Sequence, residues 1–286
     1  MQERGPGERL LQVFTTRPVT SADLGLRGRG PCFLAGALPP APRVAIVGSR
    51  AARRDRLALL GPAIAAMRTA GLALVSGGAI GVDIAAHRAA LAGEVPQLAV
   101  LPCGADRPYP LQHVPWYRSI AAAAGSGLLF CHPPGTEPCR PMFASRNAIV
   151  VELAVAVLVV EAAGRSGSHG TGICALKRER PVAVVLGSPG CADLVARGAT
   201  GLPGDRDAFA PAFATWLARV SGADVRLERR WPAELRWLDA ALTAAGPRGL
   251  GLDAVPELLT RLVDVLEAER LGLVVESPRG RYRRVE

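Results

Sequence analysis

Three short apolar runs in this chain each end abruptly in glycine and hydroxyl residues, and no other feature of the sequence constrains the fold as strongly. The runs and the loops that close them are residues 44–47 with Gly48, Ser49 and Arg50, residues 72–76 with the loop 76–81, and residues 155–160 with the loop 164–171. Short, uninterrupted apolar runs are typical of buried parallel strands, whose carboxyl ends meet at one edge of the sheet. Turns at that edge free backbone N–H groups, which bind anions together with hydroxyl and guanidinium groups. The pattern therefore predicts one extended phosphate-binding edge.

From residue 43 onward the sequence predicts strands and helices in alternation. The expected strands are residues 43–47, 72–76, 97–101, 127–130, 155–160 and 182–186, and the expected helices are 53–70, 82–92, 114–124, 144–154, 170–178, 189–201 and 205–220. Each connection is long enough for a helix, which favours an α/β fold with a doubly wound, mostly parallel sheet and helices on both faces. Pro62 is expected to divide the first connection, as the first residue of its second helix.

The chain is predicted to fold as a main domain with a smaller one after it. Residues 1–42 carry little periodicity and are expected to be a lead-in segment with a short strand near 32–34. Residues 43–222 form the main domain, and the charged segment 221–232 is the expected linker. The elements expected beyond it are helices at 233–244, 252–259 and 260–270 and strands at 271–275 and 281–285. Short helices followed by a β-hairpin indicate a winged-helix-like domain over residues 232–286.

The charge distribution favours a polyanionic partner. The 286 residues carry a formal net charge of +9, and because residues 226–286 hold 11 Arg against 10 Asp and Glu, an excess of +8 lies before them. A basic, glycine-rich domain suits a polyanion better than a small metabolite. A GC-rich genome is an alternative explanation for 33 Arg beside one Lys, but it does not account for the sign of the charge.

Membrane insertion, secretion and metal binding find no support in the sequence. The longest apolar stretch, residues 153–160, lies between Glu152 and Glu161 and is far too short to span a bilayer. The N-terminal residues lack the apolar core of a signal peptide, so we expect the protein in the cytoplasm. The six cysteines form no C-x-x-C pair, and no histidine stands at zinc-site spacing, so no metal and no cofactor is expected.

The second glycine loop is followed at once by an acid that opens a helix. The loop residues that we expect at the phosphate-binding edge are Ser76, Gly77, Gly78 and Gly81. Three glycines in five positions destabilise a chain unless the backbone must approach something closely. Asp83 at the helix start and His87 one turn later lie on one helix face, where Asp83 caps the helix with His87 as its partner. We favour that structural role over ligand contact or acid–base chemistry.

Two further groups of polar residues stand at expected helix starts. Arg146 and Asn147 either face one ligand edge or simply lie on the surface. Ser166, Gly167 and Ser168 either offer hydroxyl and N–H groups to a second phosphate or form a serine N-cap. The order and spacing of all these elements favour the ligand-binding alternative for the set as a whole.

The ordered set of motifs resembles the DprA/Smf family, the DNA-processing proteins of bacterial transformation. The matching elements are Val-Ala-Ile-Val-Gly-Ser-Arg at 44–50, Ser-Gly-Gly-Ala-Ile-Gly-Val-Asp at 76–83 with Ala86 and His87, Pro-Cys-Gly-Ala-Asp at 102–106 with Tyr109 and Pro110, the stretch 143–149 with Arg146 and Asn147, Val-Leu-Val-Val-Glu-Ala at 157–162 before Ser166, Gly167 and Ser168, and Arg-Pro-Val at 180–182. The resemblance covers residues 43–203. One departure is Ile80, which stands where the family usually has Arg.

The resemblance implies a Rossmann-like domain that binds single-stranded DNA, forms a homodimer and helps to load the RecA recombinase. The residues that it implies for the strand-binding groove are Gly48, Ser49, Arg50, Ser76, Gly77, Gly78, Gly81, Arg146, Asn147, Ser166, Gly167 and Ser168. Because only 5% of the residues are aromatic, we expect contacts to phosphate to dominate. Replacing Arg50 or Arg146 is expected to weaken binding and to leave folding largely intact.

Two other functions remain open on the sequence alone. The first is an enzyme of the wider superfamily that cleaves the N-glycosidic bond of a nucleoside monophosphate, although Cys174 stands where that group carries its glutamate. The second is a nucleotide-sensing module. We favour binding without catalysis, because no spacing of histidines and acids indicates a nucleophile, a metal site or paired carboxylates.

The C-terminal domain is expected to contact protein rather than to read DNA. Its charge is nearly balanced, whereas a DNA-reading winged helix usually presents a basic face. The arginines on the expected wing, which keep DNA contact as an alternative, are Arg279, Arg281, Arg283 and Arg284.

Overall fold

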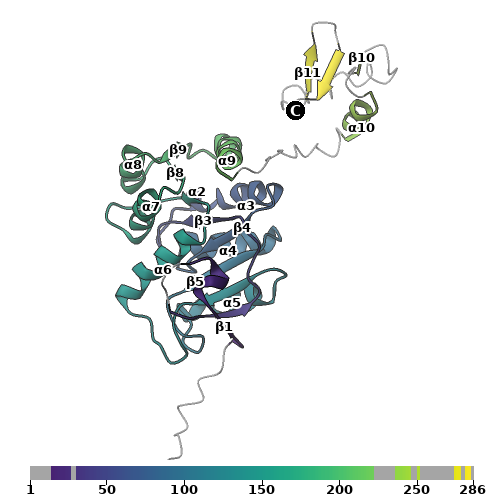
Figure 1. Ribbon diagram of the computed structural model, residues 1–286. Coiled ribbons are helices and arrows are strands. Elements are labelled where there is room, and N and C mark those ends of the chain that lie inside the picture. The colour runs from purple at the N-terminus through teal and green to yellow at the C-terminus, as the bar shows by residue number, and fades with distance from the viewer. Residues whose placement is uncertain are drawn as a thin grey trace, which may run out of the picture. The chain divides into compact units, whose positions relative to one another are not determined.

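A nine-stranded sheet organises the first part of the molecule (Figure 1). Its strands are β1 (Arg17–Val19), β2 (Cys32–Gly36), β3 (Arg43–Val47), β4 (Ala73–Ser76), β5 (Gln97–Leu101), β6 (Gly127–Phe130), β7 (Ala156–Val159), β8 (Val182–Val185) and β9 (Thr200–Leu202). They lie in the order β1-β2-β6-β5-β4-β3-β7-β8-β9. Along this spatial order, every neighbouring pair in the part β6-β5-β4-β3-β7-β8-β9 is parallel. Strand β2 pairs antiparallel with both β1 and β6. The α/β fold with a mostly parallel sheet is therefore confirmed.

The coordinates come from a computed structural model that describes residues 14–26, 30–221, 236–245, 250–251, 274–277 and 281–284. The chain divides into two compact units, Met1–Leu227 and Glu228–Glu286. No described helix combines the length and the apolar composition that crossing a membrane requires.

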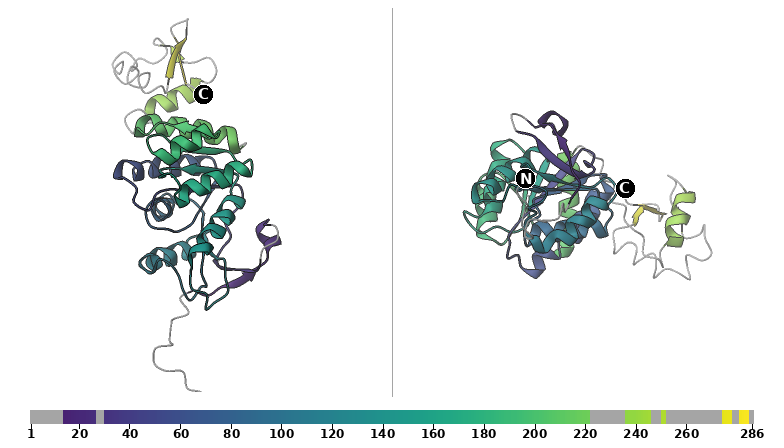
Figure 2. Two further views of the ribbon diagram at one scale, coloured as in Figure 1. Left: turned by 90° about the vertical axis from the view of Figure 1, so that its left-hand side faces the viewer. Right: turned by 90° about the horizontal axis from the view of Figure 1, so that it is seen from below.

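Helices cover both faces of the sheet, which runs between them in the turned views (Figure 2). The helices of this unit are α1 (Ser21–Leu24), α2 (Arg54–Leu57), α3 (Leu60–Thr69), α4 (Val82–Ala92), the 3₁₀ turn η1 (Leu111–His113), α5 (Val114–Ala122), α6 (Arg140–Glu152), α7 (Gly167–Lys177), α8 (Pro189–Ala196) and α9 (Arg206–Ser221). Helices α6, α7 and α8 pack on one face, and α3, α4 and α9 pack on the other. Helix α5 packs beside α4 over β5 and β6.

The predicted strands follow the buried runs closely, while the ends of the sheet differ. β3, β5 and β6 have the predicted bounds, and β4, β7 and β8 lie within one residue of them at each end. The helix expected at 189–201 is wrong at its end, because α8 stops at Ala196, the chain turns at Gly198 with φ of +104°, and β9 follows. Pro62 is the third residue of α3, although the connection does divide before it.

The order of the strands creates a switch point between β3 and β7. From β3 the chain crosses to β4 on one side, whereas from β7 it crosses to β8 on the other. In open α/β sheets such a point leaves a crevice at the carboxyl ends of the strands, where ligands bind. The loops after β3 and β7 therefore flank a position at which a site is expected.

The described residues of the second unit form one helix and a small antiparallel sheet. The helix is α10 (Arg236–Ala245), and β12 (Arg281–Arg284) pairs with both β10 (Leu250–Gly251) and β11 (Val274–Ser277). The helices predicted at 252–259 and 260–270, and the predicted linker beyond Ser221, lie outside the described residues. The winged-helix assignment and the domain boundaries remain predictions.

We predict that Gly48→Ala destabilises the first unit because α4 packs directly on the turn after β3. A Cβ atom at position 48 would lie 2.5 Å from Cγ2 of the buried, β-branched Val82. Crowding of this kind lowers the free energy of unfolding by about 1–3 kcal/mol. The control is Gly61→Ala in α3, where a Cβ meets open space, and which should add about 0.5–1 kcal/mol. Urea denaturation measures both, and equal effects of the same sign would contradict the packing argument.

Candidate functional site

A groove of about 730 Å³ opens at the carboxyl ends of β3 and β7, at the switch point of the sheet. Of the residues predicted for the site, it is lined by Gly48, Ser49, Arg50, Arg146, Asn147, Ser166, Gly167 and Ser168. Further lining residues that the sequence analysis did not assign to the site include Arg140, Phe143, Gly170 and Thr171. The groove thus joins the loop after β3, the middle of α6 and the start of α7.

The floor of the groove holds a buried pair of opposite charges. The Asp83 carboxylate accepts the N–H of Ala79 at 3.3 Å and also the N–H groups of Gly48 and Gly77. The Arg146 guanidinium donates to the carbonyl of Gly77 and, at 3.0 Å, to that of Val100. Burial raises the pKa of Asp83 and lowers that of Arg146, and the attraction between the two opposes both shifts.

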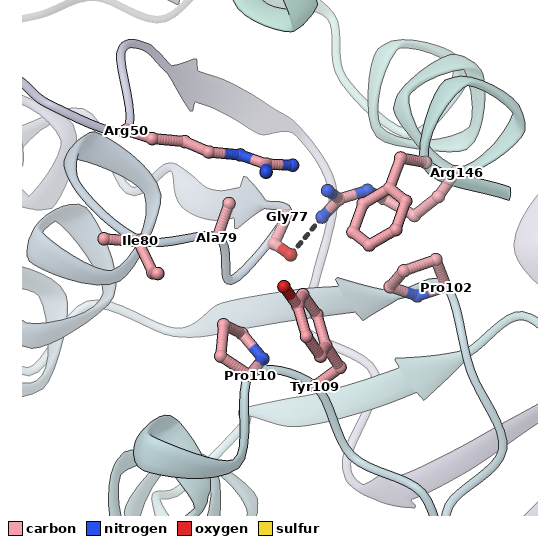
Figure 3. Close-up of a pocket in the computed structure, with 9 residues that line it drawn as sticks. Arg50, Gly77, Ala79, Ile80, Pro102, Tyr109, Pro110 and Arg146 are labelled. Atoms are coloured by element: carbon pink, nitrogen blue, oxygen red, sulfur yellow. Dashed lines mark hydrogen bonds between the residues drawn. The ribbon is translucent and has the colours of Figure 1, made fainter. Parts of the chain in front are cut away.

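Of the two alternatives for Arg146, the surface position is wrong, because the side chain is buried. Its side chain is only 3% exposed, which argues against the expectation that replacing it leaves folding intact. Helix α6 begins at Arg140, four residues before the predicted start at 144. Arg146 therefore lies inside the helix, on the side that packs against the sheet, and its guanidinium points to the Gly77 carbonyl (Figure 3). It shapes the floor of the groove, although it still lines it.

The second glycine loop braces the first loop, and Ser76, Gly77, Gly78 and Gly81 do not line the large groove, although Ala79 of the same loop does. Ser76 is buried, and its hydroxyl donates to the carbonyl of Ile46 at 2.6 Å instead of facing a ligand. The carbonyl of Gly78 accepts the Tyr117 hydroxyl at 2.8 Å. Gly81 has a φ of +84°, and the next N–H, that of Val82, donates to the carbonyl of Ser49 at 3.2 Å. The Ser76 hydroxyl and the N–H groups of Gly77 and Ala79 are therefore engaged within the protein.

His87 does not pair with Asp83, which corrects the expected capping arrangement. Its ring nitrogen Nδ1 lies 2.7 Å from the side-chain amide of Gln97, at the start of β5. Burial lowers the pKa of His87 to about 4, so the imidazole is neutral at physiological pH. Asp83 does have the favoured structural role, but its partners are the two glycine loops and Arg146.

Anion-binding groups remain available on two sides of the groove. Arg50 is exposed, and its guanidinium lies 5.4 Å from the centre of the Phe143 ring. On the other side Ser166 caps α7 by accepting the N–H of His169 at 3.3 Å, as one alternative expected. Gly167 and Ser168 are the first two residues of that helix. Their N–H groups have no acceptor within the helix and carry partial positive charge.

An aromatic cluster adjoins the groove, and sequence reasoning did not assign it to the site. The rings of Tyr109 and Phe143 meet edge to face at 5.7 Å. Both line a small pocket with Arg50 and Ile80, and Figure 3 shows Arg50 reaching over that pocket toward the Arg146 guanidinium. The available signal was the pair of quoted motifs that contain Tyr109 and Phe143. Nothing in the linear sequence showed that they meet, because 34 residues separate them.

The chemistry of the groove is that of anion and ring binding. Asp83 is the one carboxylate among the residues that line it, and its oxygens are engaged by backbone N–H groups. Among the described residues, no cluster of three or more His, Cys, Asp or Glu side chains is placed to hold a metal ion. Cys174 also lines the groove, at the position where the glycosidase motif would require glutamate.

A family sequence model and individual relatives of this chain point to the same protein family. The sequence model of a family described as DNA recombination-mediator protein A matches residues 31–210. A putative DNA processing protein DprA from Mycobacterium tuberculosis is 42% identical over 195 residues, which cover 64% of this chain and 48% of the relative. The chain thus spans about half the length of that relative.

Two solved structures of DNA processing protein A resemble the fold. The X-ray structure from Streptococcus pneumoniae is 31% identical, with a TM-score of 0.56 over 62% of this chain and 64% of that one. The structure from Helicobacter pylori is described in terms of a single-stranded DNA binding mode. It is 24% identical, with a TM-score of 0.62 over 73% of this chain and 98% of that one, and it supports the fold alone.

We predict that Arg146→Ala destabilises the first unit strongly. Removing the guanidinium leaves the Asp83 carboxyl buried without its cation, a change that costs about 3–5 kcal/mol in other proteins. The control is Arg140→Ala, an exposed arginine in the first turn of the same helix, which should change the free energy of unfolding by less than about 0.5 kcal/mol. Denaturant titration measures the difference, and similar stabilities for the two variants would show that Arg146 is not a structural residue.

We also predict that stability falls as the pH drops from 6.5 toward 4 through protonation of His87. The unfolded chain binds this proton near pH 6.5 while the folded chain resists it to about 4, so the unfolded state binds more protons in this window. The resulting slope is at most about 1.4 kcal/mol per pH unit. The raised pKa of Asp83 acts in the opposite direction, so the comparison with His87→Gln isolates the imidazole. An unchanged slope in that variant would contradict the prediction.

Proposed function

The chain belongs to the DNA recombination-mediator protein A family, the DprA/Smf family that its motifs resemble, and from that premise we propose that its groove binds single-stranded DNA. One observation supports the proposal above the others. An exposed guanidinium, an aromatic ring and a helix N-terminus border one groove. They belong to Arg50, Phe143 and the first turn of α7. These are the groups that bind a phosphate, a base and a second phosphate.

The geometry favours a single strand over a duplex. A base stacks on a side-chain ring when its own face is free, and in a duplex both faces of an interior base are covered by its neighbours. Phe143 is partly exposed and lies beside Arg50, so an unpaired base meets the ring while the adjoining phosphate meets the guanidinium. Aromatic stacking tolerates any base, which suits DNA of arbitrary sequence.

Binding without catalysis is the proposal, because the acids near the groove serve the fold. The Glu161 carboxylate accepts the N–H of Arg53 at 3.0 Å at the start of α2, and Asp83 holds the two glycine loops. The alternative reaction on a nucleoside monophosphate needs a glutamate where Cys174 stands. That alternative gains no observation from the structure.

The partners that the family resemblance implies complete the proposal. We propose that the protein acts on incoming DNA in the cytoplasm, forms a homodimer and loads the RecA recombinase onto the bound strand. A chain that spans about half of its curated relative need not share every activity of that relative, so both associations require measurement. Sedimentation of the full chain measures the first, and the kinetics of RecA assembly on single-stranded DNA measure the second.

We predict that single-stranded DNA binds in preference to duplex, and that the affinity falls with salt at a log–log slope of about −0.7 per neutralised phosphate. Arg50→Ala should weaken binding by about 1.5–3 kcal/mol, the value of a hydrogen bond to a charged group, and should make the slope shallower. The control is Arg68→Ala, an exposed arginine of α3 that does not line the groove. Fluorescence titration with labelled single-stranded and duplex oligonucleotides gives the affinities.

A matched series with nucleoside monophosphates completes this experiment. Preference for duplex, salt-independent affinity, or equal losses for Arg50→Ala and Arg68→Ala would each overturn the proposed groove. Release of free base from a nucleoside monophosphate, lost in a Glu161→Gln variant, would favour the enzymatic alternative.

A further inference from the structure

Exposed apolar side chains gather on one side of the groove instead of scattering over the surface. Six large apolar or aromatic side chains are exposed in the described residues, and four of them come from two short segments. These four are Ile80 (41% exposed), Tyr109 (41%), Leu111 (73%) and Trp116 (37%). Clustering of this kind marks a binding surface, whereas single exposed apolar residues need no explanation.

The cluster begins at the groove and leads away from it. Ile80 and Tyr109 line the small pocket that Arg50 and Phe143 share (Figure 3). From Tyr109 the chain passes through Leu111 in η1 to Trp116 in the first turn of α5. Helix α5 packs against α4, which starts directly after Ile80. We name these four side chains, together with Arg88 of α4, the α4–α5 strip.

The strip repeats the chemistry of the groove. The Arg88 guanidinium lies 4.5 Å from the centre of the Trp116 ring, just as Arg50 lies over Phe143. Arg88 is six residues after Val82, the first residue of α4, which places this second pair about 9 Å along the helix. One guanidinium–ring pair, Arg50 with Phe143, therefore borders the groove, and a second, Arg88 with Trp116, joins α4 to α5.

The positive charge around the α4–α5 strip indicates which kind of ligand it binds. Residues 84–93 and 107–122 contain Arg88, Arg107 and Arg118 and no Asp or Glu. Among the described residues, only Arg107 of these three forms ion pairs, with Asp106 and Glu137. Exposed rings beside unpaired guanidinium groups, with no acid between them, complement a polyanion that carries flat bases. An apolar protein surface without acidic residues would leave these guanidinium groups without a counter-charge. A second copy of the same basic strip would repel them.

We propose that the α4–α5 strip is a second subsite for single-stranded DNA, which takes the strand where it leaves the groove. The proposal rests on the proposed function of the groove. A base stacks on Trp116, and the Arg88 guanidinium contacts the adjoining phosphate, while Ile80 and Tyr109 cover the apolar faces of the bases between the two subsites. Ile80 at this position then contributes apolar contact area rather than a cation.

The test compares short and long strands. We measure the affinity of the full chain for oligothymidylates of about 6 and about 20 nucleotides, lengths that fill one subsite and more than one. Trp116→Ala should lower the affinity for the long strand at least fivefold, the lower end of the loss on removing a stacked ring, and should leave the short strand unchanged. Arg88→Gln should act in the same direction, and Trp116→Phe should restore most of the loss. Arg50→Ala should weaken both lengths.

The outcomes separate the two proposals. If the full chain binds both lengths, Arg50→Ala weakens both, and Trp116→Ala and Arg88→Gln leave the long strand unchanged, the second subsite is refuted and the groove stands. If neither length binds, the proposed function itself fails. Leu111→Ser serves as a second strip variant with an exposed side chain, in case Trp116→Ala lowers the thermal unfolding temperature. If Trp116→Ala changes the sedimenting mass of the protein and not its affinity for DNA, the strip is an interface between copies and the proposal is overturned.

Discussion

Hydrogen bonds from two buried side chains of opposite charge, Asp83 and Arg146, to the backbone hold together the three segments that make the groove. Asp83 accepts N–H groups from the loop after β3 and the loop after β4, while Arg146 reaches from α6 to the carbonyl of Gly77. The contact depends on Gly77 having no side chain, because a Cβ there would overlap the Arg146 guanidinium and lie 2.7 Å from Asp83 Oδ2. A buried pair of this kind adds little net stability, yet removing one member is costly. It therefore fixes the position of the loops more than it stabilises the fold.

The division between engaged and available charges follows from that arrangement. Asp83 and Arg146 oppose each other in the floor, so neither presents a free charge to the groove. The exposed cations are Arg50 and Arg140, and the first turn of α7 adds partial positive charge. A ligand anion thus meets groups that are not needed for folding, which is why we separate the effect of Arg50 from that of Arg146.

Aromatic rings are more prominent around the groove and the α4–α5 strip than the composition indicated. Only 5% of the residues are aromatic, which favoured contacts to phosphate. Phe143 and Trp116 nevertheless each lie beneath an arginine, and Tyr109 meets Phe143 edge to face. The composition gives only the number of aromatic residues, whereas their contribution to binding depends on where the rings lie in the fold. If the strand follows both guanidinium–ring pairs, base stacking contributes to affinity alongside the phosphates.

The sequence by itself determined the sheet and the edge at which the groove opens, and only the tertiary structure decided which side chains line that groove. Buried runs such as 97–101 and 127–130 are short and bounded by turns, which favours strands, and the loop that follows β3 lies at the carboxyl edge of the sheet. The role of Arg146 depended instead on which face of α6 packs against the sheet, because that face turns the guanidinium to the carbonyls of Gly77 and Val100. Ser76 likewise faces Ile46 because the neighbouring strand offers a carbonyl there. Side-chain direction is set by contacts between segments far apart in the chain, and no local pattern records them.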